Sequence, residues 1–181
     1  MNRIFSLIIV ILLLPVFFIT SVLICLEDGL PIFFIQKRVG KDNKLFHIFK
    51  FRTMSKDTPD IPTHMLKKVN VSYTQLGPIL RKLSIDEIPQ LFNIILGDMK
   101  FIGPRPALYN QEDLIQLRKE KDIHSLYPGI TGWAQVNGRD NISISKKVEL
   151  DLYYKNNKSA YLDVKILLLT FLKVLRSEDV S

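Results

Sequence analysis

The sequence predicts an α+β protein that is attached to a membrane through its N-terminal segment. Residues 4–26 hold no charged residue, and a run of that length is typical of a membrane segment. Residues 45–52 alternate as in a β-strand, and apolar residues between positions 84 and 96 recur at helical spacing. A chain of 181 residues is long enough to bury a core between such elements.

The N-terminal apolar segment has a proline, Pro15, at its centre. Proline removes one helical hydrogen bond and clashes with the preceding turn, so we expect a bend there. A bent segment either crosses the bilayer or turns back into the same leaflet, and periodicity favours neither. No A-x-A cleavage site follows, which disfavours a signal peptide. Lysine and arginine are dense between positions 37 and 52, so the positive-inside rule puts the main domain in the cytoplasm.

The net charge of +7 and the pI of about 9.5 indicate an anionic partner. Nucleic acid, a phosphorylated ligand and acidic lipid head groups all fit such a charge. The single cysteine, Cys25, excludes a disulfide framework within the chain. No Walker loop, dinucleotide fingerprint, H-E-x-x-H or C-x-x-C motif is present.

Two strands are expected at residues 32–36 and 45–52, joined by a turn-rich link. If the second strand is regular, Lys50 and Arg52 leave it on one face. They then either protect a solvated edge strand or bind a phosphate, and the spacing supports the two interpretations equally.

Residues 55–77 are expected to form a loop, and a helix is expected at 84–96. This helix would begin at Ser84, and Glu87 three residues later completes a capping-box pattern. On that interpretation Glu87 caps its own helix and Asp86 merely favours the helix dipole. The alternative is that the two adjacent carboxylates do chemistry, and the local rules alone favour the cap.

Two later segments rich in proline and glycine hold candidate ligand-binding residues. In residues 97–108, two prolines fix the backbone on both sides of Arg105, which is then either poised to bind a phosphate or carboxylate or an ordinary surface arginine. In residues 127–140, Gly138 precedes Arg139, and glycine lets a backbone approach a ligand closely. On chemistry alone, the second segment is a weak indication of a phosphate or nucleotide.

Helices are expected at residues 110–122 and 143–155, and the first has no evident chemical use. The apolar run at 162–176 is short for a membrane span. It is expected to be a helix in the head-group zone of a membrane or a core helix.

The order of these pieces resembles the bacterial sugar transferase family, the small monotopic phosphoglycosyl transferases. The resemblance rests on the apolar segment with its central proline, followed by FKFRTM, RKLSIDEIPQLFNIILGDMKFIGPRP and YPGITGWAQVNGR, and it covers nearly the whole chain. It implies a re-entrant helix-break-helix at residues 1–28. A small cytosolic catalytic domain, residues 29–181, would follow at the membrane interface, with a β-hairpin and interfacial amphipathic helices. The family break is commonly Ser-Pro, whereas this chain has Leu14 before Pro15.

The resemblance also implies a reaction and its site. Family members transfer a sugar-1-phosphate from a UDP-sugar to undecaprenyl phosphate, release UMP and depend on Mg²⁺, at the cytoplasmic face of the bacterial inner membrane. By this match Asp86 is the nucleophile and a metal ligand, and Glu87 is its partner. Membrane lipids are expected neighbours, nucleic acid is not an expected partner, and the sugar, the glycan pathway and the oligomeric state stay undefined. The candidate substrate-binding residues are Lys50, Arg52, Arg81, Arg105, Gly138 and Arg139.

Two other functions fit parts of the sequence. A membrane-anchored protein that binds anionic lipid or nucleic acid explains the charge and the apolar segment, but not the ordered motifs. A soluble nucleotide-sugar glycosyltransferase lacks support because no D-x-D metal motif is present. The products separate the three: UMP indicates phosphoglycosyl transfer, UDP indicates glycosyl transfer, and neither indicates a binding protein.

Overall fold

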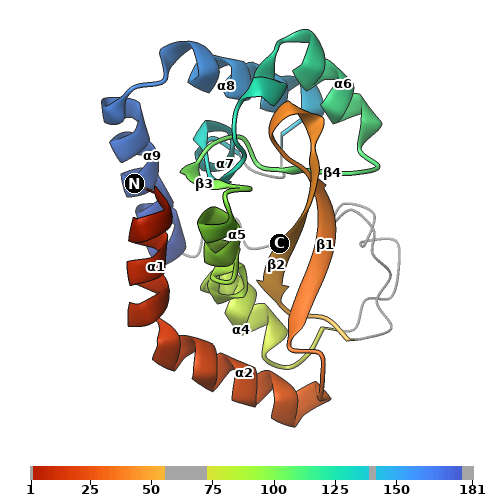
Figure 1. Ribbon diagram of the computed structural model, residues 1–181, viewed down its shortest axis with the longest axis vertical. Helices are drawn as coiled ribbons and strands as arrows, with labels where there is room; N and C mark the ends of the chain where they lie inside the picture. The colour runs from red at the N-terminus through yellow and green to blue at the C-terminus, as the bar shows by residue number, and fades with distance from the viewer. Residues whose placement is uncertain (1, 56–72, 139–141, 177–181) are drawn as a thin grey trace. The chain divides into compact units, whose positions relative to one another are not determined.

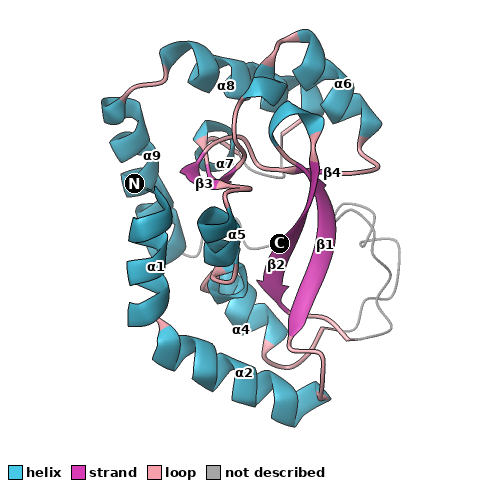
Figure 2. Cartoon of the chain, viewed as in Figure 1, coloured by secondary structure: helices cyan, strands magenta, loops and turns pink. Residues whose placement is uncertain are grey.

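The computed structural model describes residues 2–55, 73–138 and 142–176 (Figure 1). The chain forms two units, Met1–Gln36 with Ile48–Ile95 and Lys37–His47 with Leu96–Ser181. Both contain helices, and short strands occur among them (Figure 2). The predicted α+β mixture is therefore confirmed.

The first unit begins with two helices that meet at a bend. Helix α1 spans Asn2–Leu12, α2 spans Leu14–Asp28, and their axes differ by 61°. Pro15 lies in the first turn of α2, where its missing N–H leaves no hydrogen bond unmade. The predicted bend is thus confirmed, and it forms although Leu14 replaces the serine common in the family.

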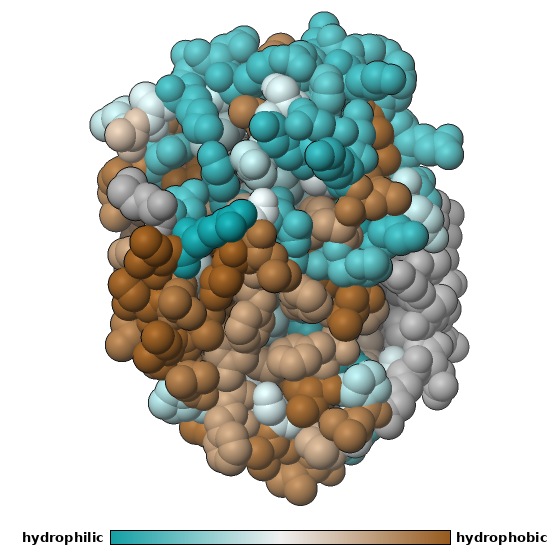
Figure 3. Space-filling model, viewed as in Figure 1, coloured by the Kyte–Doolittle hydropathy of each residue, from teal (hydrophilic) through white to brown (hydrophobic). Residues whose placement is uncertain are grey.

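The bent pair carries a large exposed apolar surface (Figure 3). Leu12 and Phe18 are each 71% exposed, and Leu26 is 79% exposed. No helix among the described residues has by itself the length and hydropathy to cross a membrane, whereas α1 and α2 together meet both criteria. Large exposed apolar patches mark sites of protein or membrane contact.

The inner side of the helix pair packs into the first unit. Phe17 and Ile24 of α2 form a core with Phe51 and with Leu80 of α4, which spans Gly77–Lys82. The rings of Phe17 and Phe51 lie 5.5 Å apart between centroids. The hydroxyl of Ser6 donates to the Leu91 carbonyl of α5, Gln90–Leu96, at 2.9 Å. The helix pair therefore shares one core with the elements that follow it.

The predicted β-hairpin is present. Strand β1 spans Phe33–Val39 and β2 spans Leu45–Phe51, with the 3₁₀ helix η1, Lys41–Asn43, in the turn. Strand β4, Ala107–Leu108, pairs antiparallel with β1, which gives the sheet order β2-β1-β4. Strand β1 continues three residues beyond its predicted end, because its last residues pair with β4.

The second unit holds a parallel pair of strands among helices. Strand β3, Lys100–Ile102, pairs with β5, Gly129–Thr131. The helices are α6 (Glu112–Glu120), η3 (Ile123–Ser125), α7 (Trp133–Val136), α8 (Ile144–Asn157) and α9 (Ala160–Arg176). Helices α6 and α8 confirm the predictions for 110–122 and 143–155.

Helix α9 has a buried apolar side and an exposed apolar side. The sequence left open whether residues 162–176 form a core helix or a helix in the head-group zone of a membrane. Leu162 and Ile166 are buried in a core with Val136 and Tyr154. Phe171, by contrast, is largely exposed, together with Val164, Leu167, Leu168 and Leu172. One side of the helix therefore belongs to the core, while another presents apolar side chains to the surroundings.

The single helix predicted at 84–96 is wrong. A 3₁₀ helix, η2 (Ile85–Glu87), is followed by α5, and Pro89 lies between them. A continuous α-helix would bond the residue 89 amide to the Ile85 carbonyl, and proline has no such amide. The Ile85 carbonyl instead accepts from the Ile88 amide at 3.1 Å. The proline thus divides the segment and leaves the two carboxylates in their own turn.

The segment that precedes η2 also differs from the prediction, which was a loop up to residue 77 and no helix between residues 77 and 84. Residues 77–82 form α4, although no helix was expected there. Most of the predicted loop at 55–77 lies outside the described residues. Met54, just before it, and Tyr73, within it, form an isolated antiparallel bridge.

Candidate active site

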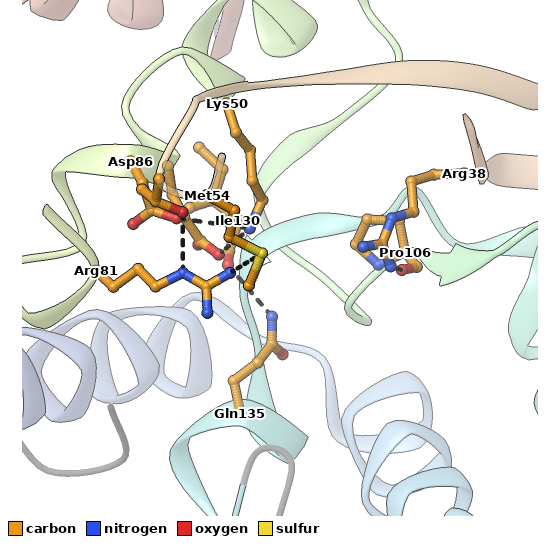
Figure 4. A network of polar contacts seen from close by, with 10 residues as sticks. Arg38, Lys50, Met54, Arg81, Asp86, Pro106, Ile130 and Gln135 are labelled. Atoms are coloured by element: carbon orange, nitrogen blue, oxygen red, sulfur yellow. Dashed lines mark hydrogen bonds and ion pairs between the residues drawn. The ribbon is translucent and has the colours of Figure 1, made fainter. Parts of the chain in front are cut away.

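Asp86 and Glu87 lie in η2 of the first unit, and both are buried. Lys50 of β2 reaches both of them (Figure 4): its Nζ lies 2.8 Å from Glu87 Oε1 and 3.9 Å from Asp86 Oδ2. Two buried carboxylates and an ammonium group thus meet, although 37 and 36 residues separate them in the chain. Such clusters of partly desolvated charge are enriched at functional sites.

The predicted cap formed by Ser84 and Glu87 is wrong. Ser84 has φ of +54° and its side chain makes no cap hydrogen bond, while Glu87 accepts from Lys50. Positive φ is costly for serine and disfavours the extended geometry that an N-cap needs. The capping pattern in the sequence therefore does not explain the position of the two carboxylates.

The geometry distinguishes the two carboxylates. Glu87 makes the short charged hydrogen bond to Lys50, whereas Asp86 stands at ion-pair distance from the same ammonium. Glu87 is thus the closer of the two carboxylates to Lys50.

Arg81 belongs to α4, which contacts η2. Its Nε donates to Thr53 Oγ1 at 3.1 Å, and its guanidinium lies 5.2 Å from the centre of the Tyr73 ring. Figure 4 draws Arg81, Lys50 and Asp86 in one network of polar side chains. The structure therefore brings two of the predicted cationic residues, Lys50 and Arg81, into the unit and the neighbourhood of the carboxylates.

Arg52 has a different environment from Lys50. Its Nη2 donates to the carbonyls of Asp28 and Gly29 at 3.0 and 2.8 Å and lies 2.9 Å from Asp28 Oδ2. The guanidinium is buried, and these partners belong to the C-terminal end of α2. Strand β2 ends at Phe51, so the strand alternation that grouped Arg52 with Lys50 does not extend to it. Substrate binding by Arg52 stays a prediction.

The remaining candidates belong to the second unit. Arg105 lies between its two prolines, half-buried, and its carbonyl accepts from Arg118 Nη1 at 2.8 Å. Gly138 has φ of +145°, and a Cβ there would lie 2.4 Å from Ile142 Cγ2, so the position demands glycine. Arg139 lies outside the described residues. Ligand binding by these three residues stays a prediction.

One buried ion pair was missed from the sequence. Arg118 of α6 donates from Nε and Nη2 to Asp151 Oδ2 of α8, at 3.0 and 2.6 Å. Burial raises the pKa of the Asp151 carboxyl, and the charge of Arg118 opposes that shift. The sequence held no signal for this pair, because a charged residue on a polar helix is normally solvated. Arg118 also donates from Nη1 to the carbonyl of Arg105, and this hydrogen bond fixes the backbone there.

The carboxylates fit the magnesium ion that the resemblance implies. Among the described residues, no three His, Cys, Asp or Glu side chains gather in a way that could enclose a metal. Mg²⁺ needs no such cage, because it commonly binds one or two carboxylates, water and substrate phosphates. Asp86, with Glu87 beside it, offers that donor set, and we assign the metal to Asp86 as a proposal only.

The chain is similar to known proteins along nearly its whole length. The sequence profile "Bacterial sugar transferase" matches residues 1–177. The chain is 48% identical to the uncharacterized sugar transferase EpsL of Bacillus subtilis, over 90% of this chain and 79% of the relative.

Two longer relatives have more specific names. The chain is 40% identical to the UDP-N-acetylgalactosamine-undecaprenyl-phosphate N-acetylgalactosaminephosphotransferase of Aeromonas hydrophila and 36% identical to the UDP-glucose:undecaprenyl-phosphate glucose-1-phosphate transferase of Escherichia coli K12. The matches cover 89% and 91% of this chain, but 39% and 37% of those relatives. With a profile that spans nearly all of its length and relatives of this identity, the chain belongs to the bacterial sugar transferase family.

Proposed function

We propose that this protein transfers a sugar-1-phosphate from a UDP-sugar to undecaprenyl phosphate, with release of UMP, as the first membrane step of a bacterial surface glycan. The family membership and the names of the relatives support the reaction class. The observation that carries the proposal is the buried Asp86–Glu87 pair beside Lys50. A helix-capping role does not explain this pair.

The proposed reaction has two displacement steps at one phosphorus atom. A carboxylate oxygen of Asp86 attacks the phosphorus that bears the sugar, and the bond from that phosphorus to the oxygen bridging to the uridine phosphate breaks. UMP leaves with that oxygen, and an acyl phosphate links the sugar to the enzyme. An oxygen of undecaprenyl phosphate then attacks the same phosphorus, and the bond between that phosphorus and the Asp86 oxygen breaks. The lipid diphosphate sugar leaves, and the Asp86 carboxylate is restored.

The first step brings an anionic nucleophile to an anionic donor, so positive charge is required. Lys50 lies within ion-pair distance of Asp86 and is suited to contact the phosphate oxygens as the new bond forms. Arg81 of the same unit is proposed to bind a further phosphate group. Phosphate binding by Arg105 and Arg139 stays a prediction from the family resemblance. Bound Mg²⁺ would neutralise phosphate oxygens in the same way.

The bent helix pair suggests where the proposed reaction takes place, at the membrane interface. The undecaprenyl chain stays in lipid while its phosphate lies at the interface, so the enzyme must work at that depth. We propose that α1 and α2 form a re-entrant element in the cytoplasmic membrane, with the site facing the cytoplasm. The 61° bend and the exposed apolar side chains support this topology.

The proposed reaction is tested by its products. Purified protein in lipid is incubated with undecaprenyl phosphate and a panel of UDP-sugars, and nucleotide release is measured. At least one donor should yield UMP together with a lipid diphosphate sugar. Release of UDP would make the protein an ordinary glycosyltransferase, and no release with any donor would favour the membrane-anchored binding protein.

The re-entrant topology predicts that both ends of the helix pair lie on one side of the membrane. The exposed Cys25 is first replaced by serine, and single cysteines are then placed at Asn2 or Asn43. An impermeant thiol reagent applied to intact cells should label neither, and permeabilised cells should be labelled at both. Labelling of position 2 alone from outside would show that the segment spans the bilayer.

A further inference from the structure

We propose that Arg52 and Glu27 are positioning residues that fasten the C-terminal end of α2 to the two elements that carry Lys50 and Arg81. The inference rests on the proposed function, because it concerns how the proposed catalytic cluster is held. It assigns Arg52 a role other than direct substrate binding, and it gives Glu27 a role that its sequence context did not suggest.

Arg52 binds the end of α2 through groups that a helix leaves unpaired. The last carbonyls of an α-helix have no partner within the helix and carry partial negative charge. One nitrogen of Arg52 contacts the Asp28 and Gly29 carbonyls and the Asp28 carboxylate. The Arg52 amide also donates to the Ile32 carbonyl at 2.9 Å. Because Arg52 follows Lys50 by two residues, the position of α2 is tied to that of Lys50 through a short stretch of chain.

Glu27 makes the corresponding contact with α4. Its Oε1 accepts from the Gln75 amide, and its Oε2 accepts from the Leu76 amide at 3.2 Å. Leu76 precedes the first residue of α4 and cannot itself cap the helix with an apolar side chain. Glu27 therefore supplies acceptors for amides at the start of α4, and α4 carries Arg81 one turn later.

The two anchored elements also fit each other closely. A Cβ at Gly77 would lie 2.1 Å from the Thr53 carbonyl oxygen, so the start of α4 lies directly on the chain that follows Arg52. The Thr53 carbonyl accepts from the Thr74 amide at 3.2 Å, and Thr53 Oγ1 accepts from Arg81. With so little free space, a displacement of α2 would be passed on to Lys50 and Arg81 together.

The alternative is that Arg52 itself holds a substrate phosphate. The structure argues against it, because only 7% of the Arg52 side chain is exposed and its charge is already paired with Asp28. A phosphate would have to reach a guanidinium that is buried against the end of α2. The two roles differ in kinetics: a substrate-binding arginine governs KM for the donor, whereas a positioning residue governs kcat through the geometry of the catalytic groups.

The experiment compares Glu27→Gln and Arg52→Lys with the control Glu149→Gln, all in the full chain in lipid. Glu149 is exposed and pairs with Lys146 of the same helix, so its substitution removes the same charge from a residue outside the first unit. The experiment measures kcat and KM for the UDP-sugar donor, and it measures deuterium uptake of the backbone amides at positions 75–82. We expect Glu27→Gln to lower kcat about tenfold and to speed exchange by a similar factor, because one charged hydrogen bond is lost. Its KM should stay within about twofold of the wild-type value.

Arg52→Lys should lower kcat and leave KM similarly unchanged, and Glu149→Gln should alter nothing. A rise in KM for Arg52→Lys without a fall in kcat would overturn the positioning role of Arg52. For Glu27→Gln, wild-type kcat, whether or not exchange is faster, would overturn the role of Glu27. Hydrogen–deuterium exchange can be measured without the UDP-sugar donor and without the undecaprenyl phosphate acceptor. A wild-type protein that releases no UMP would therefore refute the proposed function, while altered exchange would still report the anchoring.

Discussion

Replacing Asp86 by asparagine is expected to lower UMP release by about 10⁴-fold or more, because the amide has no anionic oxygen to attack phosphorus. The loss should occur without unfolding, since asparagine has nearly the same shape as aspartate. Lys50 loses its ion pair with Asp86 at 3.9 Å but keeps its 2.8 Å hydrogen bond to Glu87. The measurement is UMP release under single-turnover and steady-state conditions, with circular dichroism as the check on folding.

The same variant tests the covalent intermediate directly. Wild-type protein incubated with donor and no lipid acceptor should gain the mass of one phosphosugar at position 86, and the asparagine variant should not. Asp42→Asn is the matched control, because Asp42 is exposed in the hairpin turn at φ of +54°, a conformation that asparagine tolerates well. Near-normal turnover by the Asp86 variant, or a phosphosugar on another residue, would remove Asp86 from the proposed mechanism.

The parts of the fold that the sequence predicts well are those set by neighbouring residues. Pro15 bends the N-terminal segment because its effect on the backbone is local. Alternating residues and a turn-rich link predict the hairpin, and helical periodicity predicts α6 and α8. The prediction of one helix at 84–96 fails because Pro89 interrupts an otherwise regular helical pattern from within.

The site depends on contacts that no local rule contains. Asp86 and Glu87 satisfy a capping pattern in the sequence, and only Lys50 of β2 shows that Glu87 is otherwise engaged. Arg52 alternates with Lys50 in the sequence but turns to the end of α2, because the strand ends between them. The proposed role of Asp86 comes from the family resemblance. For Arg105 and Arg139 the sequence pattern leaves phosphate binding as one of two interpretations, and the resemblance favours it.

The ion pair between Arg118 and Asp151 is the second feature whose removal should have a large effect. Arg118→Met leaves the Asp151 carboxylate buried without its partner, which typically costs about 3–5 kcal/mol. Trp133 is the only tryptophan of the chain, lies in the same unit and stacks on Tyr153, so its fluorescence reports the unfolding of that unit. Urea titration should show a clearly lower midpoint for the variant than for the wild type.

The matched control is Lys146→Met, which removes a cation from an exposed pair with Glu149 on the same helix as Asp151. Because exposed ion pairs contribute little, we expect a change below about 1 kcal/mol. Equal midpoints for Arg118→Met and Lys146→Met would contradict the view that burial makes the Arg118 pair important.

The double variant Arg118→Met with Asp151→Leu separates the ion pair from the other contact of Arg118. With both charges gone, no unpaired carboxylate remains buried, so most of the lost stability should return. The hydrogen bond from Arg118 to the Arg105 carbonyl is absent from the double variant too, and its loss should leave a deficit of about 1 kcal/mol. A double variant as unstable as Arg118→Met alone would mean that Arg118 acts mainly through Arg105. In that case the pair with Asp151 adds little, and the segment between the two prolines is what Arg118 stabilises.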